Sequence, residues 1–213
     1  SVTGVQTCAL PILRLGQRGF DVALADKAGD FGGRLVWETQ LPGLRTWNRV
    51  ADYRLGQLRK MPNVSLFPAS ELSAQDVAEF GADHVVVATG ARWLKRLCGS
   101  NELPSEDIDG PHIYTPDDLA RGKVPEGPVV VFDFDNYYLG SAISEGLAQR
   151  GLEIHYVTTA GTASAWSFMT NEQPLIHQAL AQRGISYRTL QIVTGFDGQR
   201  VKLAQIFSGD PSD

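Results

Sequence analysis

Cysteine is scarce in this sequence, and its scarcity excludes two kinds of site. The 213 residues contain two cysteines, Cys8 and Cys98. Two thiols cannot build a disulfide framework, and by themselves they cannot hold an iron–sulfur cluster. We therefore expect a reducing, cytoplasmic setting for the protein.

Positive charge and long apolar runs are lacking as well. The formal net charge is −5 at pH 7, and the Lys and Arg residues form no cluster. The footprint of nucleic-acid binding and an attraction to anionic membranes are therefore both missing. No apolar run approaches the roughly 20 residues that a membrane-spanning helix needs. With 43% hydrophobic and 20% charged residues, the composition is that of a soluble globular protein with one or two domains.

Metal-ligand spacing is absent too. The four histidines are His84, His112, His155 and His177. None is spaced from another as zinc ligands are, and we expect each to be structural or exposed. The sequence thus predicts neither a metal site nor a catalytic residue.

The N-terminal segment is unusual. Residues 2–12 read VTGVQTCALPI, show no amphipathic period and lack the basic start of a signal peptide. They match the in-frame translation of a common sequencing-library adapter, and a natural apolar strand or helix is the alternative. We set residues 1–12 aside as non-native, so the natural sequence is expected to begin near Leu13.

From there the chain alternates between helix and strand patterns. Residues 13–19 predict the last turns of a helix ending at Gly19, and residues 29–33 a glycine-rich turn. Strands are predicted at 20–26, 64–68 and 84–88, and helices at 46–60 and 73–80. The run at 84–88 is fully apolar, which is typical of a buried parallel strand.

A second alternating unit follows a connecting loop at residues 97–127, which includes a helical turn at 116–120. Strands are predicted at 128–134, 153–158 and 185–190, helices at 140–150 and 171–183, and a hairpin at 191–207 before a polar tail. Strand–helix alternation occurring twice predicts an α/β fold with two Rossmann-like parallel-sheet units, both incomplete.

The first unit carries one residue of a dinucleotide site. In such a unit a glycine-rich turn lies about 20 residues before an acid that binds the ribose hydroxyls. Asp26 stands where that acid belongs, but the turn would fall within residues 1–12. Backbone amides of that turn supply most of the phosphate affinity. We therefore expect this chain to bind adenine nucleotides weakly or not at all.

Two further segments strengthen the assignment of Asp26. Asp26-Lys27, followed by Gly32-Gly33-Arg34-Leu35, resembles the acid and paired glycines of flavoproteins with two dinucleotide domains. The run Val85 to Gly90, which ends in Ala88-Thr89-Gly90, resembles the strand-to-loop segment that packs close to the cofactor in the same proteins. The predicted cofactor-binding residues are Asp26, Lys27, Gly32, Gly33, Arg34, Leu35, Ala88, Thr89 and Gly90.

Together with Leu41-Pro42-Gly43, Asp52-Tyr53-Arg54 and Ala91-Arg92-Trp93, these segments resemble the C-terminal part of the trimethylamine, dimethylamine and histamine dehydrogenase family. The resemblance covers roughly residues 13–207 and extends more distantly to dienoyl-CoA reductases. It implies an N-terminal TIM barrel, outside this chain, that carries FMN and a 4Fe-4S cluster. It also implies ADP or FAD in this region and, for the whole protein, an electron-transfer flavoprotein as partner and a homo-oligomer.

The second unit lacks the glycines of a working dinucleotide loop. After the strand at 128–134, glycines would be needed at three positions that hold Asp133, Asp135 and Tyr138. Two carboxylates facing a diphosphate would repel it, and the tyrosine would prevent close helix–strand packing. Binding of NAD(P)H is therefore not expected, which favours the amine dehydrogenases over the reductases.

These observations predict four segments: a non-native segment at 1–12, a truncated FAD- or ADP-binding domain at 13–96, a connector at 97–127 and a truncated NAD(P)-type domain at 128–213. The predicted function is that of a fragment of a flavin-dependent amine dehydrogenase, inactive by itself. The alternatives are a fragment of an NAD(P)H-dependent dienoyl-CoA or enoate reductase and a non-catalytic nucleotide-binding module.

Overall fold

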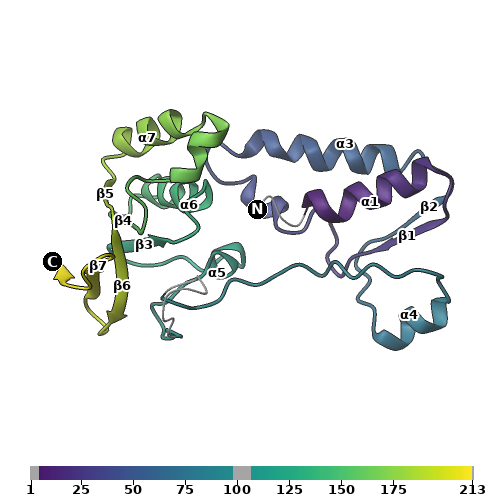
Figure 1. Ribbon diagram of the computed structural model, residues 1–213. Helices are drawn as coiled ribbons and strands as arrows, with labels where there is room; N and C mark the ends of the chain where they lie inside the picture. Colours follow the sequence, from purple (N-terminus) through teal and green to yellow (C-terminus); the bar gives the residue numbers. More distant parts are fainter. Residues whose placement is uncertain (1–4, 98–106, 213) are drawn as a thin grey trace. The chain divides into compact units, whose positions relative to one another are not determined.

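The computed structural model describes residues 5–97 and 107–212, with the backbone alone over residues 5–10. The chain divides into two compact units, Ser1–Ala91 and Arg92–Asp213. Each unit combines helices with a parallel sheet, as Figure 1 shows. The predicted α/β fold class with parallel sheets is therefore confirmed.

The first unit is built on a short parallel sheet. Its elements are α1 (Val5–Gln17), β1 (Val22–Ala25), α2 (Leu35–Glu38), η1 (Arg45–Trp47), α3 (Asn48–Leu58), β2 (Val64–Phe67) and α4 (Ala74–Phe80). Strands β1 and β2 pair in parallel, from Val22 beside Val64 to Ala25 beside Phe67. Helix α1 packs on α3 and on β1 (Figure 1).

The end of α1 and the start of β2 are tied together. The Asn63 side-chain amide donates hydrogen bonds to the carbonyls of Gly16, at 2.9 Å, and Phe20, at 2.7 Å. A methyl group on Gly16 would lie 2.8 Å from Sδ of Met61, so the Met61 side chain would have to move if residue 16 carried a side chain. Gly19, at φ +85°, ends the helix as predicted.

The predicted strand at residues 84–88 is wrong. No element is formed there, and three apolar side chains are largely exposed, at 54% for Val85, 72% for Val86 and 79% for Val87. A strand is held by backbone hydrogen bonds to a neighbouring strand. Among the described residues of this unit, β1 and β2 pair with each other and not with this segment. Neither of the two described strands of this unit therefore buries the apolar run.

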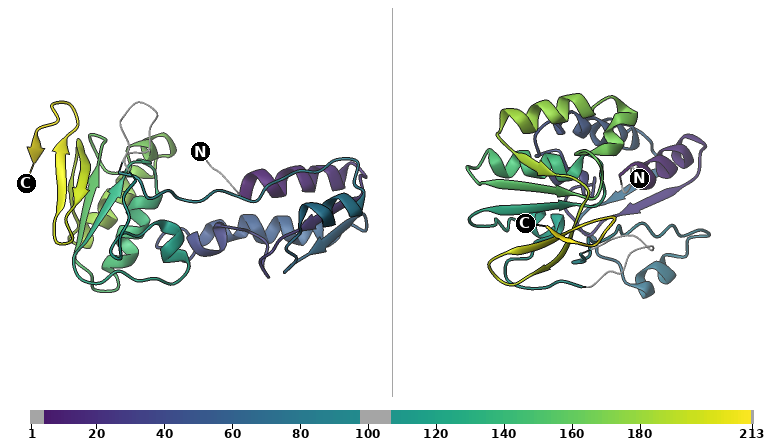
Figure 2. Two further views of the ribbon diagram at one scale, coloured as in Figure 1. Left: turned by 90° about the horizontal axis from the view of Figure 1, so that it is seen from below. Right: turned by 60° about the vertical axis from the view of Figure 1, so that its left-hand side comes forward.

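The second unit contains two sheets. Its elements are α5 (Pro116–Ala120), β3 (Val129–Asp133), α6 (Leu139–Ala148), β4 (Ile154–Thr158), η2 (Ala165–Thr170), α7 (Gln173–Gln182), β5 (Ser186–Arg188), β6 (Gln191–Phe196), β7 (Val201–Gln205) and β8 (Pro211–Ser212). The first sheet is parallel, in the order β3-β4-β5, and the second is antiparallel, in the order β6-β7-β8. Figure 2 shows the β6–β7 hairpin beside the parallel sheet.

The core of this unit lies between the parallel sheet and its helices. Helix α6 packs on β3 and β4, and α7 packs on α6. Tyr156, Val157 and Leu180 are buried almost completely. The predicted hairpin is confirmed, whereas the tail, expected to be irregular, forms β8 against β7. Its residues gain backbone hydrogen bonds at the open edge of β7.

Residues of the predicted connector belong to the second compact unit where they are described. The amide of Trp93 donates to Oδ2 of Asp117 at 2.8 Å, and Lys95 forms an ion pair with Asp109 at 2.6 Å. Residues 98–106 of the connector, which include Cys98, lie outside the described residues.

Candidate functional site

Asp26 follows β1 directly, at the carboxyl end of the strand. Its amide donates to the Phe67 carbonyl at 3.1 Å, which continues the β1–β2 pairing. Its Oδ1 accepts a hydrogen bond from the amide of Ala28 at 2.9 Å. Asp26 is partly exposed and Lys27 is exposed. The carboxylate is therefore held by its own turn and accessible to a ligand.

The paired glycines lie in the turn before α2. Gly32 has φ +142° and Gly33 has φ +54°, values that side-chain-bearing residues rarely adopt. A methyl group added to Gly33 would meet nothing within 4 Å. The glycine at 33 therefore serves the backbone conformation and keeps one side of the turn open.

The Ala88-Thr89-Gly90 segment is exposed, and Gly90 has φ +82°. Arg34 links it to the glycine turn, because Nη2 of Arg34 donates to the carbonyl of Ala91 at 2.9 Å. The structure thus brings the Gly32-Gly33-Arg34 segment and the segment ending at Ala91 together, although 57 residues separate Arg34 from Ala91.

Glu38 is part of this arrangement and was not anticipated. It lies one turn after Arg34 on α2, is 8% exposed, and places Oε1 3.9 Å from Nε of Arg34. The i, i+4 spacing of an arginine and a glutamate was a weak signal for this pair. Leu35, in contrast, begins α2 and is partly buried.

The loop after β3 is filled by its own side chains. Asp133 is 4% exposed, so its carboxylate is turned inward. The prediction that this carboxylate would face a ligand is therefore wrong. It accepts hydrogen bonds from the Tyr156 hydroxyl and, at 3.0 Å, from the amide of Asn136. Burial of the carboxyl raises the pKa of Asp133 to about 6. Asp135 is exposed, and of the two acids it is the one able to repel a diphosphate.

Asn136 fixes the rest of this loop. It has φ +57°, a conformation that asparagine tolerates better than most residues. Its side chain donates to the Phe134 carbonyl at 2.8 Å and accepts from the Thr158 hydroxyl. Its carbonyl accepts from the amide of Trp166 at 2.9 Å. The loop is therefore held by hydrogen bonds within itself and to residues 158 and 166.

Helix α6 closes the same loop from its other side. A methyl group on Gly140 would lie 2.7 Å from Cβ and Cγ of Asp133, so helix and strand approach each other at a glycine. Tyr138 precedes the helix and is partly buried, and its ring packs edge-on against Tyr137. The close packing that Tyr138 was expected to prevent occurs at Gly140 instead, and Asp133 fills the space beneath the loop.

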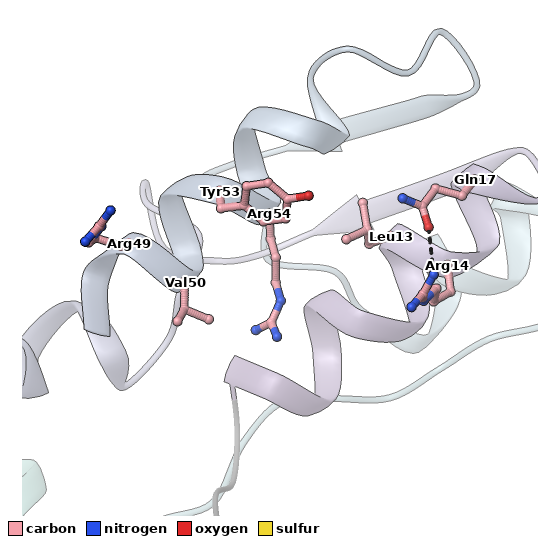
Figure 3. Close-up of a pocket in the computed structure, with 7 residues that line it drawn as sticks. All are labelled: Leu13, Arg14, Gln17, Arg49, Val50, Tyr53 and Arg54. Atoms are coloured by element: carbon pink, nitrogen blue, oxygen red, sulfur yellow. Dashed lines mark hydrogen bonds between the residues drawn. The ribbon is translucent and has the colours of Figure 1, made fainter. Parts of the chain in front are cut away.

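A separate hollow of about 470 Å³ lies between α1 and α3 in the first unit. Its lining residues are Leu13, Arg14, Gln17, Arg49, Val50, Tyr53 and Arg54. Figure 3 shows Arg54 extending from α3 between the helices, whereas Arg14 bonds to Gln17 at 3.4 Å and Arg49 points elsewhere. None of the predicted cofactor-binding residues lines this hollow, and its guanidinium groups do not converge on one point.

Two other features bear on the class of site. Across residues 5–97 and 107–212, no group of three or more His, Cys, Asp or Glu side chains is arranged to hold a metal ion. Within the same ranges, no helix has the length and apolar character needed to cross a membrane.

Comparison with known proteins identifies relatives of this chain. No family model matches it. Dimethylamine dehydrogenase of Hyphomicrobium sp. (strain x) is 32% identical over 176 residues, which cover 76% of this chain and 24% of that protein. The chain therefore spans about a quarter of the length of this relative.

Solved structures give the same relationship. The 6-hydroxypseudooxynicotine amine oxidase HisD of Pseudomonas geniculata N1 superposes with a TM-score of 0.90 and 40% identity, covering 96% of this chain and 31% of HisD. Histamine dehydrogenase of Rhizobium sp. 4-9 superposes with a TM-score of 0.88 and 34% identity, covering 96% of this chain and 32% of the enzyme. Both units of the chain therefore have counterparts in these larger proteins.

Proposed function

The chain belongs to the dimethylamine and histamine dehydrogenase family, and on this premise we propose that residues 13–213 are the adenine-nucleotide-binding part of a flavin-dependent amine oxidoreductase. The observation that carries the proposal is the convergence of the Gly32-Gly33 turn with the segment ending at Ala91, beside the contact of Arg34. A convergence of positive-φ glycines lets a ligand approach the backbone closely.

The predicted residues fit an adenine nucleotide. Asp26, at the end of β1, offers a carboxylate to the ribose hydroxyls. Gly33 and Gly90 offer backbone without side chains, since a methyl group at either would meet nothing within 4 Å. Lys27 is exposed beside Asp26 and supplies positive charge toward phosphate groups. When bound, ADP supports the structure, whereas FAD would also carry electrons.

The redox chemistry of the whole protein is assigned to parts outside this chain. As the family resemblance implies, FMN and a 4Fe-4S cluster in an N-terminal barrel would supply the redox chemistry of the whole protein. Electrons would leave to a flavoprotein partner in a homo-oligomeric enzyme. Electron exchange with NAD(P)H is not part of the proposal. The loop that would bind this dinucleotide is instead hydrogen-bonded internally through Asp133 and Asn136.

The test is to identify the nucleotide in a longer protein, in which residues 13–213 follow their natural upstream sequence. The protein is purified, denatured and its released nucleotides are separated by chromatography. We expect one equivalent of ADP or FAD in this region and its loss in Asp26→Ala. Asp30→Ala is the matched control, because Asp30 is an exposed acid of the same turn, and it should retain the nucleotide.

The same measurement separates the remaining possibilities. Flavin absorbance that survives removal of the FMN-carrying part indicates FAD bound here and an electron-carrying role. A colourless protein that releases ADP indicates a structural binding module. A protein that carries neither nucleotide, or an Asp26→Ala variant that keeps it, contradicts the proposed site.

A further inference from the structure

Arg34 connects two segments that the sheet of the first unit leaves unconnected. Its Nη2 donates to the Ala91 carbonyl at 2.9 Å, and its Nε lies 3.9 Å from Oε1 of Glu38. The guanidinium group is planar and presents several donors in fixed directions, so one nitrogen donates a hydrogen bond to Ala91 while another lies within ion-pair distance of Glu38. The Arg34 side chain is 29% exposed and that of Glu38 is 11% exposed.

The segment that Arg34 reaches needs such support. Residues 84–91 form no regular element, and every one of their side chains is exposed. Such low burial is typical of a mobile segment. A hydrogen bond from a charged donor to the backbone carbonyl of Ala91 limits that motion directly after Thr89-Gly90.

Glu38 lies within ion-pair distance of the Arg34 guanidinium. The glutamate is 8% exposed overall and lies on the inner side of α2. A nearby positive charge stabilises a carboxylate taken from water, and Arg34, the N-cap residue of α2, is one turn away. The ion pair holds the guanidinium against the helix, from which Nη2 can reach Ala91.

From this geometry we infer that Arg34 is a positioning residue, which holds the Ala88–Ala91 segment against the Gly32-Gly33 turn and so forms the two sides of the nucleotide site. Its guanidinium is directed to a backbone carbonyl and a carboxylate. Its role thus differs from the direct cofactor contact predicted from the sequence. The inference that Arg34 shapes a nucleotide site rests on the proposed function. The effect of Arg34 on the order of residues 89–91 can, however, be measured on this chain without nucleotide.

The experiment compares backbone order parameters of the chain by nitrogen-15 relaxation. In the wild type, the amides of Thr89, Gly90 and Ala91 should have values near the roughly 0.85 of rigid backbone. In Arg34→Gln they should fall below about 0.6, whereas those of β1 and β2 should stay at their wild-type values. Arg34→Lys should restore part of the order, because lysine keeps a charged donor but lacks the planar, fixed donor directions of the guanidinium.

Two further variants serve as controls. Arg59→Gln removes an exposed arginine of the same unit and should leave the order parameters unchanged. Glu38→Gln keeps the hydrogen bond from Arg34 to Ala91 but removes the ion pair of Arg34 with residue 38. It should therefore lower the order parameters less than Arg34→Gln does. If Arg34→Gln fails to fold, Arg34→Lys and Glu38→Gln decide the question.

Unchanged order at residues 89–91 in Arg34→Gln, or equal loss in Arg59→Gln, overturns the inference. In the longer protein, Arg34→Gln should also weaken nucleotide binding by roughly tenfold, as expected from losing one charge-assisted contact. A wild-type longer protein without any nucleotide would contradict the proposed function, whereas the relaxation result would still decide the role of Arg34.

Discussion

Asp133 is a buried carboxyl group whose pKa makes the stability of the fold depend on pH. Burial raises its pKa from 3.8 to about 6, against the opposing effect of the Tyr156 hydroxyl. The folded protein therefore binds this proton more tightly than the unfolded chain does. The resulting stabilisation is complete below pH 3.8 and is lost as the pH rises through about 6.

Asp133→Asn should remove this dependence. Over the window from about pH 4 to 7, the free energy of unfolding of the wild type should include a loss of about 3 kcal/mol that the variant lacks. Urea unfolding at several pH values measures it. Asp135→Asn, at the exposed neighbouring acid, should keep the wild-type slope. An equal slope in Asp133→Asn and wild type would show that the carboxyl does not titrate as described.

Asp118 should produce the opposite pH dependence. Its Oδ2 accepts from the amide and hydroxyl of Thr115, each at 3.0 Å, and its Oδ1 accepts from Lys123 at 2.8 Å. The Lys123 ammonium, followed by the Thr115 amide, holds the pKa of Asp118 well below 3.8. Its stabilisation is therefore present above pH 3.8 and is lost as the pH falls further.

Asp118→Asn should lower the free energy of unfolding by about 1–3 kcal/mol at pH 7, because it weakens both the capping box and the ion pair. The difference from wild type should shrink toward pH 2. Asp76→Asn is the comparison, since Asp76 forms the same capping box with Ser73 on the exposed helix α4, and its loss should be smaller. A cost that is independent of pH would contradict the assigned charge.

At the scale of elements, the contact of α6 with β3 depends on Gly140. A methyl group there would lie 2.7 Å from Cβ and Cγ of Asp133, closer than side chains pack. Gly140→Ala should therefore displace the helix or the aspartate and lower the free energy of unfolding by about 1–3 kcal/mol. Gly56→Ala, inside α3, adds a methyl group that meets nothing within 4 Å.

This control should be neutral or stabilising by about 0.5–1 kcal/mol, because alanine is the better helix former. Thermal unfolding of both variants tests the prediction. Equal stability of Gly140→Ala and wild type would mean that α6 can move away from β3 at little cost. The loop between β3 and α6 would then be less rigid than its hydrogen bonds indicate.

For the whole molecule, we predict that the chain binds neither NADH nor NADPH. The loop after β3 is hydrogen-bonded internally through Asp133 and Asn136, and Asp135 adds negative charge at its surface. Isothermal calorimetry with each dinucleotide should show no heat of binding at millimolar concentration. ADP should bind weakly or not at all to this chain. Micromolar affinity for either ligand would contradict the respective prediction.

The sequence by itself determined the fold class and most of the elements. Helices ending at Gly19 and Gly81 and the hairpin at residues 191–205 were predictable, because glycine conformation, apolar periodicity and turn residues are local properties. The family was also predictable, since the motifs that carry it are short and ordered along the chain. Ser73 and Thr115 likewise cap α4 and α5 through neighbouring residues.

Only the tertiary structure decided where side chains point and which segments are paired. The apolar run Val85–Val87 is exposed because burial of a strand depends on a neighbour elsewhere in the fold. Asp133 is turned inward because Tyr156, 23 residues away on the next strand, donates to it. Arg34 reaches Ala91 across 57 residues. Contacts between distant residues follow from packing, and no local pattern in the sequence encodes them.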